Sequence, residues 1–460
     1  MTAKQIIHML WIIAIALFLS VTMAMAQEPS AGNLMTLHDC MAYAISNSTR
    51  MRIEQANRDD EQWQRRQAIM QVFTPVVEAQ TYAYNQYGRN LDPETNTYNN
   101  VTTFYNGYSV SAGLTLFDGF RSVNNLKMAK TMVRMGLSQQ QQIRDEICLA
   151  VMQAYSNVVY YTNLEQVLTE QVSTAQTARD KAVRQEELGQ KGHADVLQME
   201  SELAQKQYQL INATNHRQDA MITLKDVMFW PGGEELQIDC NIHDVVTNTE
   251  AEAEATQLAE TAKSVLPSAA MAQANVRKAT LDLKMARGAY SPRLSLYGGW
   301  STTYYTYPGM KDYTPASFAN QFRNNGGEYI EVALSIPIFD QLQRRTSLHA
   351  RKNALIRSQA EYDQKMRDIE NEVTRAVNER DGAAAAFRQA DKLADLQQEA
   401  FQLSTKQFAN GLISAIEYQT ASQTYLNALA ERINAQLVLN IKNAVVQYYQ
   451  GIPYIEQSCY

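Results

Sequence analysis

The sequence predicts a mainly helical chain with a smaller β portion, built from two copies of one unit. Three observations carry this prediction. Residue pairs recur at a fixed spacing, short runs alternate between apolar and polar residues, and each copy ends in a long helical tract without proline. The mean hydropathy of −0.38 excludes a polytopic helical membrane protein, because each span needs about 20 mostly apolar residues. The net charge of −7 gives no support to nucleic-acid binding, which usually shows a basic patch.

The N-terminus has the composition of a secretory signal peptide. Lys4 precedes an apolar stretch from Ile6 to Val21, and Ala24-Met25-Ala26 fits the small-residue cleavage pattern. We therefore predict a signal peptide over residues 1–26, with an N-terminal membrane anchor as the alternative. Export permits disulfides, and four cysteines allow three full pairings, none of which the sequence selects. The four cysteines are Cys40, Cys148, Cys240 and Cys459.

Self-comparison shows the duplication. Phe117-Asp118 recurs as Phe339-Asp340, and Leu188-Gly189-Gln190 recurs as Asn410-Gly411-Leu412, both at an offset of 222 residues. The predicted organisation is a first repeat over 27–230, an inter-repeat equatorial segment over 231–254, a second repeat over 255–450 and a C-terminal tail over 451–460.

Each repeat is expected to begin with a helix and continue with two strands. The helices cover Leu37 to about Phe73 and about Ala255 to Ser291, and each ends just before a proline, which stops a helix. The strands that follow alternate between one apolar and one polar face. They are predicted at about 76–84 and 108–117 in the first repeat, and at about 294–302 and 329–339 in the second.

Long loops join the two strands of each repeat. The segments 85–107 and 305–327 are rich in Asn, Gly, Pro, Thr and Tyr, and 12 of the 25 tyrosines lie in the two hairpins. Such tyrosines fit an aromatic girdle at a membrane interface, or ordinary packing of loop and strand. The loops are then expected to be extracellular.

A very long helix follows each strand pair. Asp118 and Asp340 are predicted N-caps, with Gln343 at the N3 position of the second helix. From Arg121 to Glu187 there is no proline, which predicts a helix about 100 Å long. In it the apolar residues step by four and three, as in a coiled-coil seam. The seam residues are Ile143, Ile147, Val151, Ala154 and Val158.

Four strands of membrane-crossing length cannot close a barrel, and an open edge in lipid leaves backbone groups unsatisfied. Several chains must therefore pool their strands, unless the strands pair in water. Eight strands enclose little more than side chains, whereas twelve enclose water. A trimer with a 12-stranded barrel is the smallest assembly with an open lumen.

The chain resembles the TolC-type outer membrane efflux protein family. The resemblance rests on the duplicated unit, on the steps Phe117-Asp118-Gly119 and Phe339-Asp340 from strand to helix, and on Gly189 and Gly411 about 70 residues later. It implies a homotrimer with a β-barrel in the outer membrane lipid and a periplasmic α-helical barrel. It also implies docking to a periplasmic adaptor (membrane fusion protein) and an inner-membrane pump of the RND or ABC type.

The resemblance implies a pore constriction at Asp195 and Glu417, each six residues after its turn glycine. A ring of carboxylates attracts cations. Both residues also fit the first turn of a helix, where the dipole favours a carboxylate, and Ser414 with Glu417 forms a capping-box pattern. Both interpretations stay open. The family's second acidic position is Gln198 in one copy and Thr420 in the other, which argues against a double acidic ring.

The turns between the paired helices are expected to form the tip of the assembly. Gly189 and Gly411 fit a left-handed turn backbone. The tip is where an adaptor would dock. Because the second copy has Gly411-Leu412 and the first has Gly189-Gln190, we expect the second turn to make the stronger contact.

Catalytic motifs are absent from the sequence. The histidines are scattered without ligand spacing, and there is neither a G-x-S-x-G motif nor a phosphate loop. We therefore expect a channel without enzyme activity, cofactor or metal, which exports small molecules passively in a tripartite efflux system. The alternatives are a type I protein secretion duct and a soluble periplasmic coiled-coil scaffold.

Overall fold

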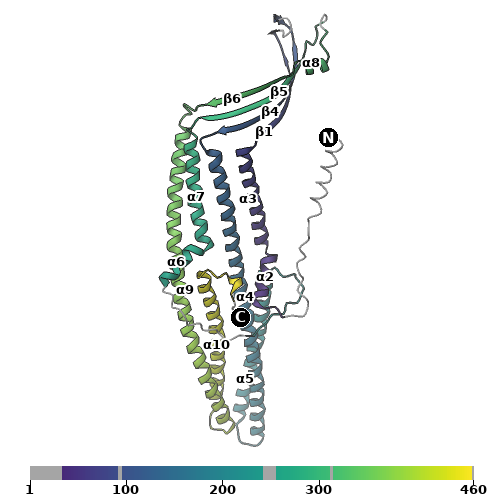
Figure 1. Cartoon of the computed structure of the whole chain (residues 1–460). Coiled ribbons are helices and arrows are strands. Elements are labelled where there is room, and N and C mark those ends of the chain that lie inside the picture. Colours follow the sequence, from purple (N-terminus) through teal and green to yellow (C-terminus); the bar gives the residue numbers. More distant parts are fainter. Residues whose placement is uncertain (1–33, 92–95, 242–254, 311–313, 458–460) are drawn as a thin grey trace, which may run out of the picture.

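The computed structural model describes residues 34–91, 96–241, 255–310 and 314–457, so the predicted signal peptide lies outside the described residues. The molecule is elongated, with a sheet near one end, helical hairpins reaching to the other, and short helices around the middle (Figure 1). The first repeat contains α2 (Leu37–Asn47), α3 (Thr49–Phe73), β1 (Val76–Gln86), β2 (Arg89–Leu91), β3 (Tyr98–Asn100), β4 (Thr103–Phe117), α4 (Arg121–Glu187) and α5 (His193–Met228). The second contains α6 (Ala255–Val265), α7 (Pro267–Gly288), β5 (Arg293–Thr306), α8 (Phe318–Asn324), β6 (Gly327–Ser335), α9 (Gln343–Ala409) and α10 (Ala415–Tyr449), followed by the 3-10 helix η1 (Tyr454–Glu456).

The duplication extends to the ends of the long helices. α4 and α9 both have 67 residues. Their first residues, Arg121 and Gln343, are 222 positions apart, and so are their last, Glu187 and Ala409. The predicted bounds of the first long helix are confirmed. So is its seam, since all its members except the half-buried Ile143 are buried.

The opening helix of each repeat is broken, and the prediction of one continuous helix was wrong in both copies. In the first, the buried Ser48 has an extended backbone between α2 and α3. In the second, Leu266 is extended because it precedes Pro267, which begins α7.

The four long strands form one antiparallel sheet in the order β1-β4-β5-β6. At their loop ends all four strands extend beyond their predicted bounds, and β6 does so by two residues because it begins at Gly327. At its other end β6 stops at Ser335, four residues before the predicted end at Phe339, because Pro337 has no N–H to donate to a ladder. The loops also contain a small hairpin, β2–β3, and helix α8, which the sequence did not predict. Within this sheet β1 and β6 are the edges.

The register places most of the apolar residues of the four strands on one face. Residues directly opposite each other in an antiparallel pair lie on the same face, so the alternation in each strand adds up across the sheet. The apolar face contains Val77, Ala79, Val110, Ala112, Leu114, Leu294, Leu296, Trp300, Ile330, Val332 and Leu334. The other face, which we call the polar face, contains Glu78, Gln80, Ser109, Ser111, Thr115, Arg293, Ser295, Ser301, Glu331 and Ser335.

The tyrosines divide between the two faces. On the polar face, the rings of Tyr82, Tyr297 and Tyr329 cover glycines of the neighbouring strand, which restores the contacts that a missing side chain forfeits. Tyr108 and Tyr304 lie on the apolar face with Trp300. Only the second group points to the side where a girdle facing lipid would lie.

The junctions from strand to long helix differ from the predicted N-caps. The N-cap residues are Phe120 and Leu342, both with left-handed backbone, so Asp118 and Asp340 lie two positions earlier and Gln343 is the first helical residue. The aspartates nevertheless satisfy a backbone donor of the first turn. Asp118 Oδ2 accepts from the Ser122 N–H at 2.9 Å, and Asp340 Oδ2 accepts from the N–H of Arg344 at 2.9 Å. Two residues with left-handed backbone precede each helix, and they turn the chain so that the aspartate side chain lies over the end of the helix.

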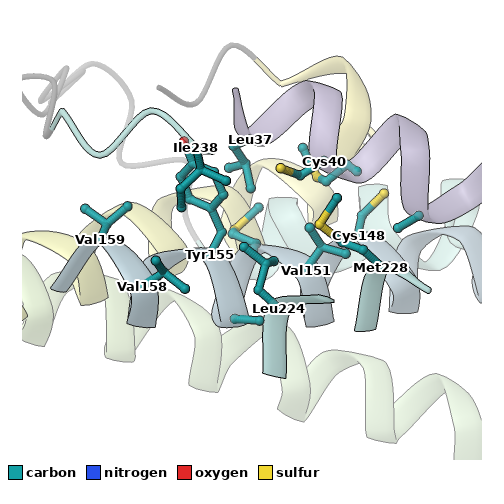
Figure 2. Packing of buried hydrophobic residues seen from close by; sticks show 14 of the residues in the cluster. Leu37, Cys40, Cys148, Val151, Tyr155, Val158, Val159, Leu224, Met228 and Ile238 are labelled. Carbon is teal, nitrogen blue, oxygen red and sulfur yellow. The ribbon is translucent and has the colours of Figure 1, made fainter. Parts of the chain in front are cut away.

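The largest core surrounds the middle of the molecule. Figure 2 shows Leu37 and Cys40 of α2 with residues of α4 and α5, including Val151, Tyr155, Leu224 and Met228. Two segments outside the repeats complete it. Ile238 of the inter-repeat segment is buried there and pairs with Met35, and Tyr454 of the tail stacks on Tyr448 with ring centroids 4.8 Å apart.

The described cysteines are free thiols. Cys40 and Cys148 are buried, and Cys240 is half-buried, while Cys459 lies outside the described residues. Burial raises the pKa of Cys40 and of Cys148 to about 12. Both thiols therefore stay protonated and poorly reactive.

Gly119→Ala tests the junction between β4 and α4. Gly119 has a φ of +71°, and an added Cβ would collide with the carbonyl oxygen of Gly288 in α7. We expect the substitution to cost about 2–4 kcal/mol, because backbone strain and a backbone clash combine. Gly382→Ala is the control, since Gly382 lies exposed within α9 with open space around it and alanine favours a helix. Thermal unfolding should show a lower midpoint for the first variant and an equal or higher one for the second.

Asp145 makes the stability depend on pH. Its side chain is buried on α4, accepts a hydrogen bond from Gln141 Nε2 at 2.9 Å and contacts Tyr448. Burial raises the pKa of Asp145 from 3.8 to about 6. The fold therefore favours the protonated form. This contribution is complete below about pH 4 and is lost as the pH rises through about 6.

We expect Asp145→Asn to raise the unfolding midpoint at pH 8 and to reduce the gain in stability between pH 8 and pH 5. The expected effect is on the order of 2–3 kcal/mol. Melting curves at several pH values measure it, with the exposed Asp180→Asn as the control. An unchanged pH profile in the Asp145 variant would contradict the assignment.

Candidate functional site at the helical tips

The two longest helices, α4 and α9, end in turns of the same type. Gly189 and Gly411 have φ values of +71° and +72°, in the left-handed region that favours glycine. In the first turn the N–H of Gln190 donates to Gln185 O and that of Gly189 to Glu186 O, both at 2.8 Å. In the second turn Leu412 N–H donates to Gln407 O and Gly411 N–H to Phe408 O. Both are Schellman motifs, which reverse the chain after a helix without leaving the last carbonyls unpaired.

Both turns expose an apolar side chain, but from different positions. Leu188, directly before the first glycine, and Leu412, directly after the second, are among the most exposed large apolar side chains. Gln190 is exposed as well. In the first turn the leucine precedes the glycine and a glutamine follows it. In the second turn an asparagine precedes the glycine and the leucine follows it.

The helices that return from the tips begin differently. α10 has a complete capping box. Ser414 Oγ accepts from the Glu417 N–H, and the Glu417 carboxylate accepts from the Ser414 N–H at 2.8 Å. The hydrogen bond from the Ser414 backbone lowers the pKa of Glu417, so this exposed side chain is an anion at neutral pH. α5 begins after Gly192 and has no side-chain cap.

Asp195 occupies the first turn of α5 and is half-buried. Its carboxylate is near Lys191, where it partly offsets the burial that lowers the pKa of that amine. Of the residues three positions after these carboxylates, Gln198 donates to Gln419 Oε1 on α10, and the Thr420 hydroxyl donates to Ile416 O at 2.9 Å. Each returning helix thus carries one carboxylate in its first turn, Asp195 in α5 and Glu417 in α10.

The two tips of one chain are packed against each other. Lys191 Nζ lies 3.4 Å from the centroid of the Phe408 ring, a cation–π contact between the first turn and the end of α9. Gln185 Nε2 donates to Ala409 O at 3.4 Å. A buried cluster beneath them joins Ala182, Val196 and Met199 of the first repeat to Phe401, Phe408, Ala415 and Tyr418 of the second. Side chains from both repeats therefore fix the positions of both turns.

Directly above the tips, α5 and α10 meet along a polar seam that sequence analysis missed. Gln419 donates to Gln205 Oε1 at 3.1 Å. Gln423 accepts from Lys206 Nζ at 3.1 Å and from Gln209 at 3.3 Å. A glutamine at helical spacing looks like a solvated residue in sequence, so no local signal distinguishes this seam from an exposed face.

The seam includes a buried ion pair. Lys206 and Glu202 have side-chain exposures of 0% and 2%, and Nζ lies 3.5 Å from Oε1. Burial lowers the pKa of Lys206, and the Glu202 carboxylate opposes this shift. Both residues lie on α5, and Lys206 also donates to Gln423 of α10. Removing Glu202 would therefore leave an uncompensated charge at the contact between the two helices.

The described residues include a contact at the first tip between His193 Nδ1 and Glu186 Oε1, which lie 2.9 Å apart. In the part of the chain that the structure describes, no cluster of three or more His, Cys, Asp and Glu side chains lies close enough to hold a metal ion. None of the described helices combines the length and the apolar character needed to cross a membrane. Chemically, the arrangement can present carboxylates, two exposed leucines and a polar interhelical seam.

Comparison with solved structures shows the same fold in bacterial outer membrane channels. CusC aligns with a TM-score of 0.76 at 15% identity, covering 90% of this chain and 92% of that chain. The CmeC outer membrane channel of Campylobacter jejuni gives 0.70 at 14% identity, covering 91% and 85%. The open state of the MtrE outer membrane channel of Neisseria gonorrhoeae gives 0.70 at 16%, covering 92% and 91%. These identities are low, so the likeness shows the fold.

A comparison with curated protein sequences gave no match. The family model for outer membrane efflux proteins, in contrast, matches residues 44–228 and 258–449, which are most of the two repeats. The duplicated helix, strand, strand and long-helix unit and the family match lead to one conclusion: the chain belongs to the outer membrane efflux protein family.

Proposed function

We propose that three copies of this chain form a passive channel through the outer membrane of a Gram-negative cell, as the exit duct of a tripartite efflux system for small molecules. The observation that carries the proposal is the sheet, which has one apolar face and two unpaired edges. In this proposal the long helices form the length of the duct, and their tips form its periplasmic end.

The apolar face supports a position in lipid. Ile330, Val332 and Leu334 of β6 are all exposed in the single chain. Exposed apolar residues that alternate with polar ones over four adjacent strands are the pattern of a transmembrane β-barrel. In water the same face would form an apolar patch of the kind that soluble monomers rarely expose.

The edges support a trimer. β1 and β6 each have a neighbour on one side only within the chain, and in lipid their free backbone groups would cost several kcal/mol each. Pairing β6 of one copy with β1 of the next satisfies both edges and closes a ring. Three copies give twelve strands, whose lumen is wide enough for water and solutes.

The tips support docking to a periplasmic adaptor and a role in the constriction. Two exposed leucines on rigid turns provide apolar anchors for a partner. Asp195 and Glu417, repeated in three copies, would form rings of negative charge at the periplasmic end. Energy for export would come from an inner-membrane pump coupled through the adaptor.

Ile330→Lys tests the position of the sheet in the membrane. A lysine on the lipid face of a barrel costs about 2–4 kcal/mol near the midplane, so we expect loss of assembled, heat-modifiable protein from the outer membrane fraction. Glu331→Lys is the matched control, because the neighbouring residue lies on the polar face and should leave assembly unchanged. A soluble scaffold would tolerate both substitutions and would fractionate without detergent.

The charge of the constriction can be separated from its capping role. Glu417→Gln removes the charge but retains a residue that completes a capping box. Ser414→Ala removes the capping hydroxyl but retains the charge of Glu417. We expect Glu417→Gln combined with Asp195→Asn to lower cation selectivity, measured as the reversal potential in planar bilayers under a salt gradient. Ser414→Ala should retain the wild-type selectivity. Equal selectivity in all variants would restrict the carboxylates to helix capping.

Cysteine cross-linking tests adaptor docking. We expect Leu412→Cys to give a higher cross-linking yield with the co-expressed adaptor than Gln190→Cys, because leucine is the apolar anchor at that position of the turn. Arg357→Cys, exposed on α9 far from the tips, is the control and should give none. Equal yields at both turns would contradict the expected asymmetry.

A further inference from the structure

Helix α8 is fastened onto the apolar face of the sheet. The buried Gln321 holds it, since Nε2 donates to the carbonyl oxygens of Tyr305 and Ala316 at 2.9 and 3.1 Å, and Oε1 accepts from the Tyr305 N–H at 3.0 Å. The Thr302 hydroxyl donates to Phe322 O at 2.9 Å. Three of these four hydrogen bonds join the seven-residue helix to β5, and the fourth joins Gln321 to the segment before the helix.

The phenylalanines of α8 pack on the aromatic residues of the apolar face. Phe322 lies with ring centroids 5.4 Å from both Trp300 and Tyr108, and Phe318 lies 5.5 Å from Tyr304. Beside these rings is a pocket of about 560 Å³. Its lining residues are Trp300, Phe318, Ala319, Phe322 and Arg323.

The pocket lies at the end of the apolar band that is farthest from the long helices. Trp300 is opposite Val110 on β4 and Glu328 on β6, and the next pair on this face, Gly298 and Ile330, begins the continuous apolar band. Arg323 and Glu328 are the charged residues at this boundary. The band and the pocket thus form one surface, with a cation where the apolar residues stop.

Neighbouring copies of the chain would leave this pocket uncovered. Trp300 is on β5, which has β4 and β6 on its two sides. The unpaired edges, where another copy would add its strands, are β1 and β6. The outward side of a central strand in a barrel meets lipid. The occupant of the pocket is therefore a lipid if the sheet lies in a membrane.

We propose that this pocket binds a phosphate-bearing anionic lipid of the outer leaflet, with an acyl chain against the Trp300 and Phe322 rings and the phosphate on the Arg323 guanidinium. The inference rests on the proposed function, since it needs the apolar face to be in the outer membrane. Guanidinium and phosphate form strong, charge-assisted hydrogen bonds. None of the ion pairs among the described residues includes Arg323. Glu328, opposite Trp300 on β6, places a negative charge at the same end of the apolar band.

Native mass spectrometry of the detergent-purified full-length channel tests this site. The probes are phosphatidylglycerol and diacylglycerol with identical acyl chains, which differ by the phosphate group, and inorganic phosphate as competitor. For the wild type we expect about tenfold tighter retention of phosphatidylglycerol, the ratio that one charge-assisted hydrogen bond supplies. Inorganic phosphate should not displace it. Equal retention of the two lipids, or displacement by free phosphate, overturns the proposal.

Three variants locate the binding. Arg323→Gln should remove the preference for phosphatidylglycerol. Glu328→Gln, the matched change of the opposite charge, should retain or increase it, and Phe322→Leu should weaken the retention of both lipids. A preference that persists in Arg323→Gln places the lipid elsewhere and overturns the site. If the sheet is not in a membrane at all, Ile330→Lys assembles like the wild type, so failure of the proposed function is recognised separately.

Discussion

The unpaired edges of a four-stranded sheet are the constraint on which the rest of this structure depends. Within each chain, β1 and β6 have a hydrogen-bonded neighbour on one side only. Four strands are too few to close a ring. Of the described residues, only α8 covers part of the apolar face. A backbone with open edges is stable in lipid only when other chains complete it. In our proposal, assembly is therefore part of the fold of the sheet.

The long helices extend the molecule far from the sheet without a large globular core. α4 and α9 pack against the shorter α5 and α10 along apolar clusters that recur from the middle to the tips. The helices are anchored at three places. The aspartates at the strand-to-helix junctions fix the upper ends, the core with Ile238 and Tyr454 fixes the middle, and the Lys191–Phe408 contact fixes the tips.

The interactions between the repeats change character along the length. Around the middle they are apolar, whereas above the tips α5 and α10 are also joined by glutamine hydrogen bonds, one of them from the buried Lys206. Polar contacts specify geometry more strictly than apolar ones but contribute less net stability, because each replaces a hydrogen bond to water. The tips share a buried apolar cluster, and the polar contacts above them add geometric precision rather than much stability.

The sequence by itself determined whatever depends on local periodicity or on the repeat. The bounds of α4, the seam through Ile147, Val151 and Val158, the two faces of β4 and β6, and the left-handed glycines at 189 and 411 could all be predicted, because a period of two or 3.6 and a positive φ are properties of adjacent residues. Local rules also produced errors where a neighbour intervened. Leu266 breaks the predicted helix because Pro267 follows it, and Phe120 and Leu342 take the N-cap position from the aspartates.

Only the tertiary structure decided which side chains meet across elements. The burial of Asp145 against Tyr448, the packing of α8 on Trp300, the tyrosines over glycines on the polar face and the Lys206 seam join residues up to 303 positions apart in the chain, from Asp145 to Tyr448. Each of these residues has an ordinary local context, and its role comes from register and helix packing. Those are set by the summed burial of whole elements, which no single segment encodes.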